Sequence, residues 1–411
     1  MVQEMPESKK RAMRAISKPA VYGPDLDING YSRSGEEGYR CPLTELPEDV
    51  VERSLEVGVT PREEERSATY FQIDHSVVFS AVREMFKGKV EVLSTAEALQ
   101  KYDWFKNYWW RIVPVDADKY TALAELKWDQ GYFIRILEGE KVTLPLQACL
   151  FISTDNLNQN VHNVIIAEPD SEIQMITGCT VHRNVNRGLH VGVSEFYIKE
   201  GAKLTFTMIH DWSPRFDTRP RTGALIEEDG TFICNYICLK PVKSLQTYPV
   251  AYCKGANSRA RFNSIIYGSS DSYIDVGAKI VLQNEGSRGE IINRAVGKGE
   301  STIYARGMLV GERANTKAHL ECRGLLLSDK ASIYAAPELL AKTNRTELSH
   351  EAAIGKISEE EVCYLMARGF SREEAEALII RGFMDVDILG LPEELKKRIE
   401  KMIEATTERA L

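Results

Sequence analysis

Residues 271–339 read "DSYIDVGAKIVLQNEGSRGEIINRAVGKGESTIYARGMLVGERANTKAHLECRGLLLSDKASIYAAPEL". Within this stretch, short β-rich runs alternate with small or polar breaks. The runs begin near Asp271, Arg288, Ser301, Lys317 and Ala331, so they recur at intervals of about 15 residues. No helix-length amphipathic segment separates them. The pattern predicts many short, evenly spaced strands, as in an antiparallel sandwich or a solenoid.

Turn signals decide between these two architectures. Asn-Gly and Asp-Gly pairs, which mark tight hairpins, are sparse between the runs, and the near-constant spacing continues over many units. Both observations favour a parallel β-helix. The aliphatic residue at every sixth position that a left-handed hexapeptide solenoid would show is missing. We therefore expect a mainly β protein in which residues 143–335 form a right-handed parallel β-helix.

The residues before the β-helix differ in composition. Residues 1–65 mix charged residues with Pro and Gly, which predicts a loosely ordered or partner-dependent arm. Residues 66–142 predict a mixed α/β region with helices. Ser94 and Glu97 there form the S-x-x-E pattern that marks a helix start.

The last part of the chain, residues 336–411, predicts helices. Two segments open with the S-x-x-E pattern, at Ser358 and Ser371, and close with Gly369 and Gly382, which suit the residue after a helix end. So small a helical unit buries little surface by itself. We therefore expect it to pack on the β-helix or to dock a partner.

Composition excludes several functional classes. The net charge of −8 argues against nucleic acid as the main partner, because phosphate binding needs a concentrated basic surface. No apolar run approaches the roughly 18 residues of a membrane span, and the first residues lack the apolar core of a signal peptide, so we expect no membrane contact and a cytoplasmic protein. The phosphate-loop motif is absent, so the chain should not hydrolyse ATP by itself.

The cysteines offer the main candidate chemistry. The sequence contains eight, without a C-x-x-C pair that would indicate a self-contained zinc or ferredoxin-type site. Cys322 is followed 28 and 29 residues later by His350 and Glu351, close to two strand intervals. If one coil contains two strands, the three residues stack, and thiolate, imidazole and carboxylate form a plausible ligand set for iron. The alternative is a buried structural thiol beside a surface pair.

Three stretches resemble the SufB/SufD family, the scaffold proteins of SUF iron–sulfur cluster assembly. They are "FKNYWWRIVPVDADKYTALAELKWDQGYFIRILEGEKVTLPLQA", "ITGCTVHRNVNRGLHVGVSEFYIKEGAKLTFTMIHDWS" and "LSHEAAIGKISEEEVCYLMARGFSREEAEALIIRGF". The resemblance runs from about residue 70 to residue 390. It implies a right-handed parallel β-helix with a C-terminal helical region that docks a SufC-like ABC ATPase.

The resemblance also implies roles for individual residues. Cys322 falls where the SufB branch has its essential cluster-assembly cysteine, and Glu351 where that branch has its carboxylate ligand. His350 matches a histidine of both branches. Cys179 matches the cysteine proposed to receive sulfur and pass it through the β-helix interior. The cysteine-rich N-terminal motif of many SufB proteins is missing, with only Cys41 in that region.

The leading hypothesis is therefore a scaffold subunit that assembles a transient Fe–S cluster at a subunit interface. Catalytic roles fall to Cys322 and Cys179, and iron ligation to Cys322, His350 and Glu351. The expected partners are a SufC-like ATPase, a sulfur donor (a cysteine desulfurase or sulfide) and a second copy in a homodimer. A second hypothesis is a SufD-like, non-catalytic subunit that anchors and regulates the ATPase. A polysaccharide-cleaving β-helix enzyme ranks last, because no acidic column repeats along the polar faces.

Overall fold

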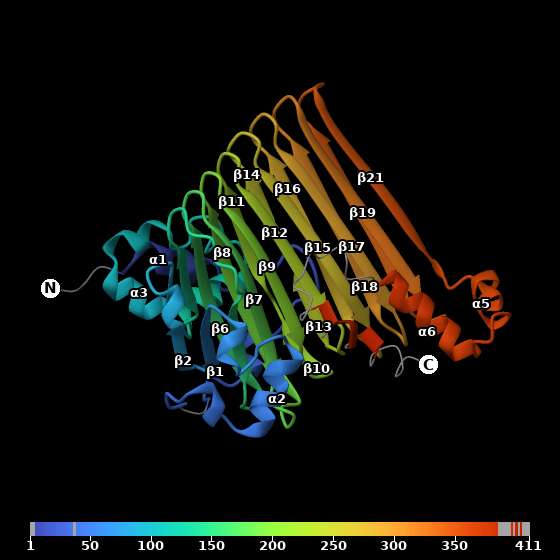
Figure 1. The fold of residues 1–411 in the computed structure, drawn as a ribbon, viewed down its shortest axis with the longest axis horizontal. Helices are drawn as coiled ribbons and strands as arrows, with labels where there is room; N and C mark the ends of the chain where they lie inside the picture. The colour runs from blue at the N-terminus through green and yellow to red at the C-terminus, as the bar shows by residue number, and fades with distance from the viewer. Residues whose placement is uncertain (1–4, 36–37, 385–395, 398, 402, 405–411) are drawn as a thin grey trace.

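Two long sheets of mostly parallel strands face each other and wind into a β-helix of about eight turns (Figure 1). The computed structural model describes residues 5–35, 38–384, 396–397, 399–401 and 403–404. The predicted mainly β fold built on a parallel β-helix is confirmed. Helices lie at its two ends along the chain.

The first sheet has the order β2-β1-β5-β7-β9-β12-β15-β17-β19-β21. Its strands are β1 (Ala68–Ile73), β2 (Ser76–Val82), β5 (Leu146–Ile152), β7 (Glu172–Val181), β9 (Lys203–Asp211), β12 (Thr231–Cys238), β15 (Arg259–Gly268), β17 (Arg288–Gly297), β19 (Thr316–Leu326) and β21 (Thr346–Lys356). Only the pairing of β1 with β2 is antiparallel in this sheet.

The second sheet contains the alternate strands of each coil. Its strands are β3 (Val90–Ser94), β4 (Tyr132–Ile136), β6 (Leu157–Ala167), β8 (Arg187–Ile198), β10 (Arg215–Thr218), β11 (Arg221–Ile226), β13 (Ser244–Thr247), β14 (Val250–Cys253), β16 (Tyr273–Leu282), β18 (Thr302–Gly311) and β20 (Ser332–Ala341). Strand β18 pairs with β16 and β20, so β20 ends this sheet.

The coil length follows from the register. Successive coils place Thr231 beside Arg259 and Thr316 beside Thr346, so one coil takes 28 to 30 residues and contributes one strand to each sheet. The sequence interval of about 15 residues is therefore half a coil.

Left-handed turn residues fix this coil length. One corner of each coil has a residue with positive φ, and these residues stack from coil to coil: Asp170, Gly201, Asp229, Asn257, Gly286 and Asn315. Asn, Asp and Gly are the residue types that tolerate this conformation. At Gly286 a Cβ atom would lie 2.2 Å from Asn257 Oδ1 of the preceding coil, so the stack also requires glycine there.

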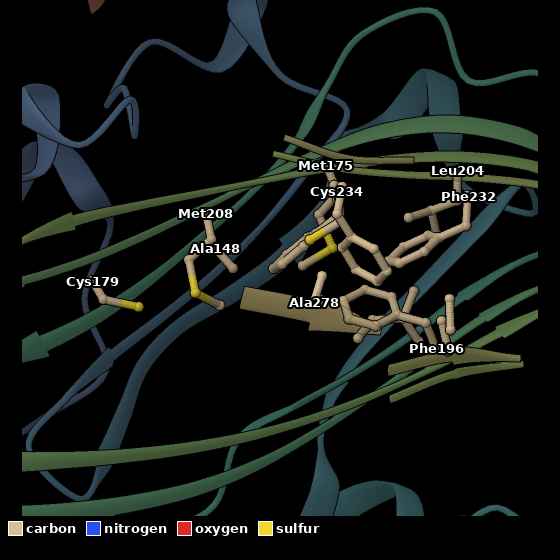
Figure 2. Packing of buried hydrophobic residues seen from close by; sticks show 14 of the residues in the cluster. Ala148, Met175, Cys179, Phe196, Leu204, Met208, Phe232, Cys234 and Ala278 are labelled. Atoms are coloured by element: carbon tan, nitrogen blue, oxygen red, sulfur yellow. The ribbon is translucent and has the colours of Figure 1, made fainter. Parts of the chain in front are cut away.

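The interior between the two sheets is the main hydrophobic core. Large aromatic rings fill it in the middle coils, where Phe196 lies 4.7 Å from Phe206 and 4.9 Å from Phe232 between ring centroids (Figure 2). Cys179 and Cys234 are part of the same buried cluster. The β-helix is thus a packed solid, and no open channel crosses the region drawn in Figure 2.

The helices lie outside the β-helix. They are α1 (Glu7–Ala15), α2 (Glu48–Glu56), α3 (Thr95–Lys101), α4 (Lys119–Leu126), α5 (Glu359–Met366) and α6 (Arg372–Phe383), with 3₁₀ turns at Ile28–Gly30, Leu43–Glu45, Glu63–Glu65, Glu84–Phe86 and Asp103–Asn107. Among the residues that the structure describes, no helix combines the length and apolarity that a membrane span requires.

The N-terminal segment differs from the loose arm that composition predicts. Tyr31 Oη donates to Asp217 Oδ2 at 2.7 Å, and the Gly23 backbone N–H donates to Asp275 Oδ2 at 3.1 Å. Arg53 of α2 binds buried Asp211. These polar groups lie far from the arm in sequence, so local composition does not reveal that the segment packs along the β-helix. Residues 1–4 and 36–37 of this prediction lie outside the described residues.

The β-helix also ends later than predicted. Strands β20 and β21 continue it to Lys356, whereas the sequence placed its end at residue 335. The helical segments follow with α5 and α6, and Ile380 of α6 packs against the outer face of the first sheet, beside Ile265 and Val296. Of the predicted region 336–411, residues 385–395, 398, 402 and 405–411 lie outside the described part.

Candidate functional site

Cys322 lies in the interior of the last but one coil. Strand β19 alternates buried and outward residues, and Cys322 is on the inner face with 1% exposure. Its Sγ accepts a hydrogen bond from Asn293 Nδ2 at 3.6 Å and lies 3.9 Å from the Ala305 carbonyl oxygen of the opposite sheet. Burial raises the pKa of the Cys322 thiol, and the Asn293 hydrogen bond opposes this only in part. In this conformation the thiol is protonated at neutral pH and shielded.

One strand separates Cys322 from the end of the β-helix. Its register partner on β21 is Ala352, and β21 has no neighbour on its other side within the described chain. Several apolar side chains of the last coil are exposed: Tyr334, Leu339 and Leu340 of β20 and Ile354 of β21. The end nearest Cys322 is therefore an open, apolar edge with unpaired backbone groups.

The predicted partners of Cys322 do not converge on it. His350 stacks on Leu320, on the same face as Cys322 but displaced two residues along the strand. Glu351 stacks on Glu321, on the outer face. The two neighbours therefore point to opposite sides of the sheet, because side chains alternate along a strand. The predicted separation of about one coil holds, but the register partner of Cys322 is 30 residues away.

The outer face gathers a different set around Glu351. Ligand atoms of His319, Glu321 and Glu351 all lie within 4.8 Å of one another. His319 and Glu321 are two residues apart on β19, so they share a face. Sequence reasoning missed this pair, although H-x-E beside the candidate cysteine is a readable signal.

Cys179 lies five strands away from Cys322 in the same sheet, on β7. With strands about 4.8 Å apart, the two cysteines are separated by roughly 24 Å along the β-helix axis. Cys179 is fully buried, and burial raises the pKa of its thiol well above the usual value. His210 and then Cys238 stack on it in the next two coils. Burial raises the pKa of Cys238 to about 12.

Cys322 should react slowly with an alkylating reagent in the isolated chain. Its raised pKa lowers the thiolate fraction at pH 8 and its burial blocks approach, whereas Cys363 of α5 is exposed. We expect iodoacetamide to modify Cys363 at least about 100-fold faster than Cys322, followed by peptide mass spectrometry. Unfolding in urea is the control and should equalise the two rates. Equal rates in the folded chain would contradict the buried position.

Comparison with known proteins follows the same part of the chain. A family model described as "SUF system FeS cluster assembly, SufBD core domain" matches residues 150–383, which span the coils of β5 to β21 and helices α5 and α6. An iron–sulfur cluster assembly SufBD family protein of Methanothermobacter thermautotrophicus is 46% identical over 404 residues, covering 97% of this chain and 98% of that protein.

Two further relatives show how similarity decreases. A SufBD family protein of Archaeoglobus fulgidus is 49% identical over 354 residues, which are 86% of this chain and 94% of that protein. The iron–sulfur cluster assembly protein SufB of Bacillus subtilis is 27% identical over 384 residues, which are 92% of this chain and 82% of that protein. The similarity extends over nearly the whole chain, including the N-terminal segment.

Proposed function

Because the chain belongs to the SufB/SufD family of iron–sulfur cluster assembly proteins, we propose that it is a scaffold subunit on which a nascent cluster is built at a subunit interface. The observation that carries the proposal is the position of Cys322. This thiol is in the interior, yet only the edge strand β21 separates it from the open end. Moving one strand is enough to change a shielded thiol into an accessible ligand.

A partner ABC ATPase supplies that motion in our proposal. Helices α5 and α6 follow directly on β21 and expose four large apolar side chains, Tyr364, Met366, Phe370 and Leu378. Such a surface suits a protein partner. A SufC-like ATPase bound there would act on β21 through the short connection from Lys356 to Ser358, and ATP binding would then expose Cys322.

Sulfur reaches Cys322 from Cys179 in this scheme. A donor, either a cysteine desulfurase or sulfide, delivers sulfur near Cys179, and Cys238 lies in the same column of the interior two coils further on. In each transfer, an attacking thiolate forms a bond to the sulfane sulfur and the donor thiolate is released. Because burial raises the pKa of these thiols, transfer requires local opening of the coils. The free thiols suit a reducing cytoplasm, where we place the protein.

The second subunit is a second copy in our proposal. The terminal strands β20 and β21 each pair on one side only, and apolar side chains line both. Two copies related by a two-fold axis could pair β21 with β21 in antiparallel fashion and cover these residues. This arrangement would bring Cys322 of both copies close to one interface.

Charged residues at this edge should weaken the dimer. For the double variant Leu339→Lys/Ile354→Lys, we expect the dissociation constant to rise by 100-fold or more (about 3 kcal/mol), because two ammonium groups would have to be buried. Light scattering with size-exclusion chromatography measures the mass. Tyr364→Lys on α5 is the matched control, since it also places a lysine at an exposed apolar position. A monomeric parent chain, or a double variant that dimerises as the parent does, would refute end-to-end pairing.

Anaerobic reconstitution tests the proposed function. The purified chain is incubated with Fe²⁺, a sulfur donor, ATP and a SufC-like ATPase, and visible absorption is followed. A cluster chromophore on the chain, and its transfer to an apo-ferredoxin, are expected. Absence of the chromophore while the ATPase still binds would instead favour the non-catalytic subunit that anchors and regulates the ATPase through α5 and α6.

A further inference from the structure

The carboxylates of Glu321 and Glu351 are held side by side on the outer face. The two residues are direct register partners on the parallel strands β19 and β21, which are about 4.8 Å apart. Like charges in that position repel each other, and Glu321 is poorly hydrated because its side chain is only 16% exposed. The pair is therefore stable only with a positive charge close to both carboxylates.

Arg323 supplies part of that charge. Its Nε lies 3.0 Å from Glu321 Oε1, and its NH2 group lies 3.9 Å from Glu351 Oε1. The buried Oε1 of Glu321 nevertheless accepts no well-aligned hydrogen bond. The Arg323 side chain is 45% exposed, so it can turn into solvent at little cost. The guanidinium is thus a counter-ion that a metal ion can replace.

His319 adds a nitrogen ligand to the pair. Its Nδ1 lies 2.9 Å from Ser349 Oγ, a hydrogen bond that orients the ring. His319 and Ser349 also line a groove of about 830 Å³ along the first sheet, which gives solvent a path to the imidazole. A further basic side chain of this groove, Lys317, is paired with Glu347 at 2.6 Å.

We propose that His319, Glu321 and Glu351 bind a divalent first-row transition-metal ion on the outer face of β19 and β21. One imidazole and two carboxylates suit Fe²⁺, Mn²⁺, Co²⁺ or Zn²⁺ better than the all-oxygen cations Mg²⁺ and Ca²⁺. Metal bonds of about 2.1 Å require the ligand atoms to draw together by roughly 1 Å from their present spacing, which surface side chains can do by rotation. Resting on the proposed function, the ion is Fe²⁺, the substrate of cluster assembly.

This site uses different residues from those that the sequence suggested. Glu351 is common to both sets, but His350 and Cys322 point to the inner face and His319 and Glu321 to the outer face. Glu321 is bonded directly to Cys322 in the chain, so iron held outside is adjacent to the strand segment whose inner side carries the thiol. The two sets make opposite predictions for the two histidines.

The test is metal binding by the full chain without any sulfur donor. Fe²⁺ binding is measured by anaerobic equilibrium dialysis, and Co²⁺ is used as a spectroscopic probe of ligand type. We expect one equivalent to bind, and His319→Ala, Glu321→Gln and Glu351→Gln each to weaken the dissociation constant 10- to 100-fold. Arg323→Met should strengthen binding, because it removes the competing cation.

Two matched controls decide the outcome. His350→Ala removes the histidine of the other set, and Glu347→Gln removes a carboxylate from the same face of β21; both should bind metal as the parent does. Parent-like binding by His319→Ala, or loss of binding in His350→Ala, would overturn the proposal. Cys322→Ala separates it from cluster assembly: retained Fe²⁺ binding without a chromophore supports the outer site. A parent chain that binds no metal yet still forms a cluster refutes the site alone.

Discussion

Replacing Cys322 with alanine should abolish cluster formation while leaving the fold intact. In the reconstitution with Fe²⁺, sulfur donor, ATP and ATPase, we expect the chromophore yield to fall by at least 10- to 100-fold, since loss of a ligand should cost no less than loss of a residue that supports one. The substitution removes one sulfur atom from the interior, so the cost to stability is about 1–2 kcal/mol. Visible absorption and the melting temperature are measured on the same sample.

Cys253→Ala is the matched control for this prediction. Cys253 is also fully buried in the core, but on β14 of the opposite sheet, several coils from the open end. It should lose similar stability and keep the parent chromophore yield. If Cys322→Ala assembles a cluster as well as Cys253→Ala does, Cys322 is a core residue. The ATPase-anchoring function would then be the better description of this chain.

The second large effect concerns stability. Arg53→Met on α2 should lower the free energy of unfolding by about 3–5 kcal/mol, because it leaves a buried carboxylate without its main counter-ion. Asp211 is 2% exposed, and Arg53 lies 3.1 Å from its Oδ2 and donates to Thr180 Oγ1 at 2.8 Å. Lys240, 3.4 Å from Asp211, compensates only in part. Denaturant titration followed by circular dichroism measures the loss.

Two further variants isolate the buried charge. Arg183→Met removes an exposed arginine that pairs with Glu52, and it should change the stability by less than about 1 kcal/mol. The double variant Arg53→Met/Asp211→Asn removes both charges and should regain much of the loss. An Arg53→Met protein as stable as Arg183→Met would show that α2 contributes little to the fold.

Local signals in the sequence predicted much of the architecture. The strand interval is set by the turn residues, and the S-x-x-E patterns at Ser94 and Ser371 form the expected capping boxes. Such features depend on residues a few positions apart, which is why they can be read from one chain. The N-terminal segment could not be read in this way. Its fixation rests on Asp211, Asp217 and Asp275, which are more than 150 positions away.

The candidate site shows where the sequence becomes insufficient. An interval of 28 or 29 residues suggested that Cys322, His350 and Glu351 stack, whereas the actual coil at that point takes 30 residues. A shift of one residue moves a side chain to the other face of a sheet, so small errors in coil length exchange inner and outer residues. Glu351 therefore meets Glu321 and His319, and the sequence alone could not assign them to one face.

The open end of the β-helix has a consequence for local unfolding. In a stack of coils, each interior coil is held by two interfaces, but the coil of β20 and β21 is held by one. This coil should therefore open at the lowest free energy of any in the stack, and its amide hydrogens should exchange fastest. Cys322 lies directly beneath it. Access to the thiol can then be controlled by a binding event that shifts the equilibrium of a single coil, while the remaining coils keep their structure.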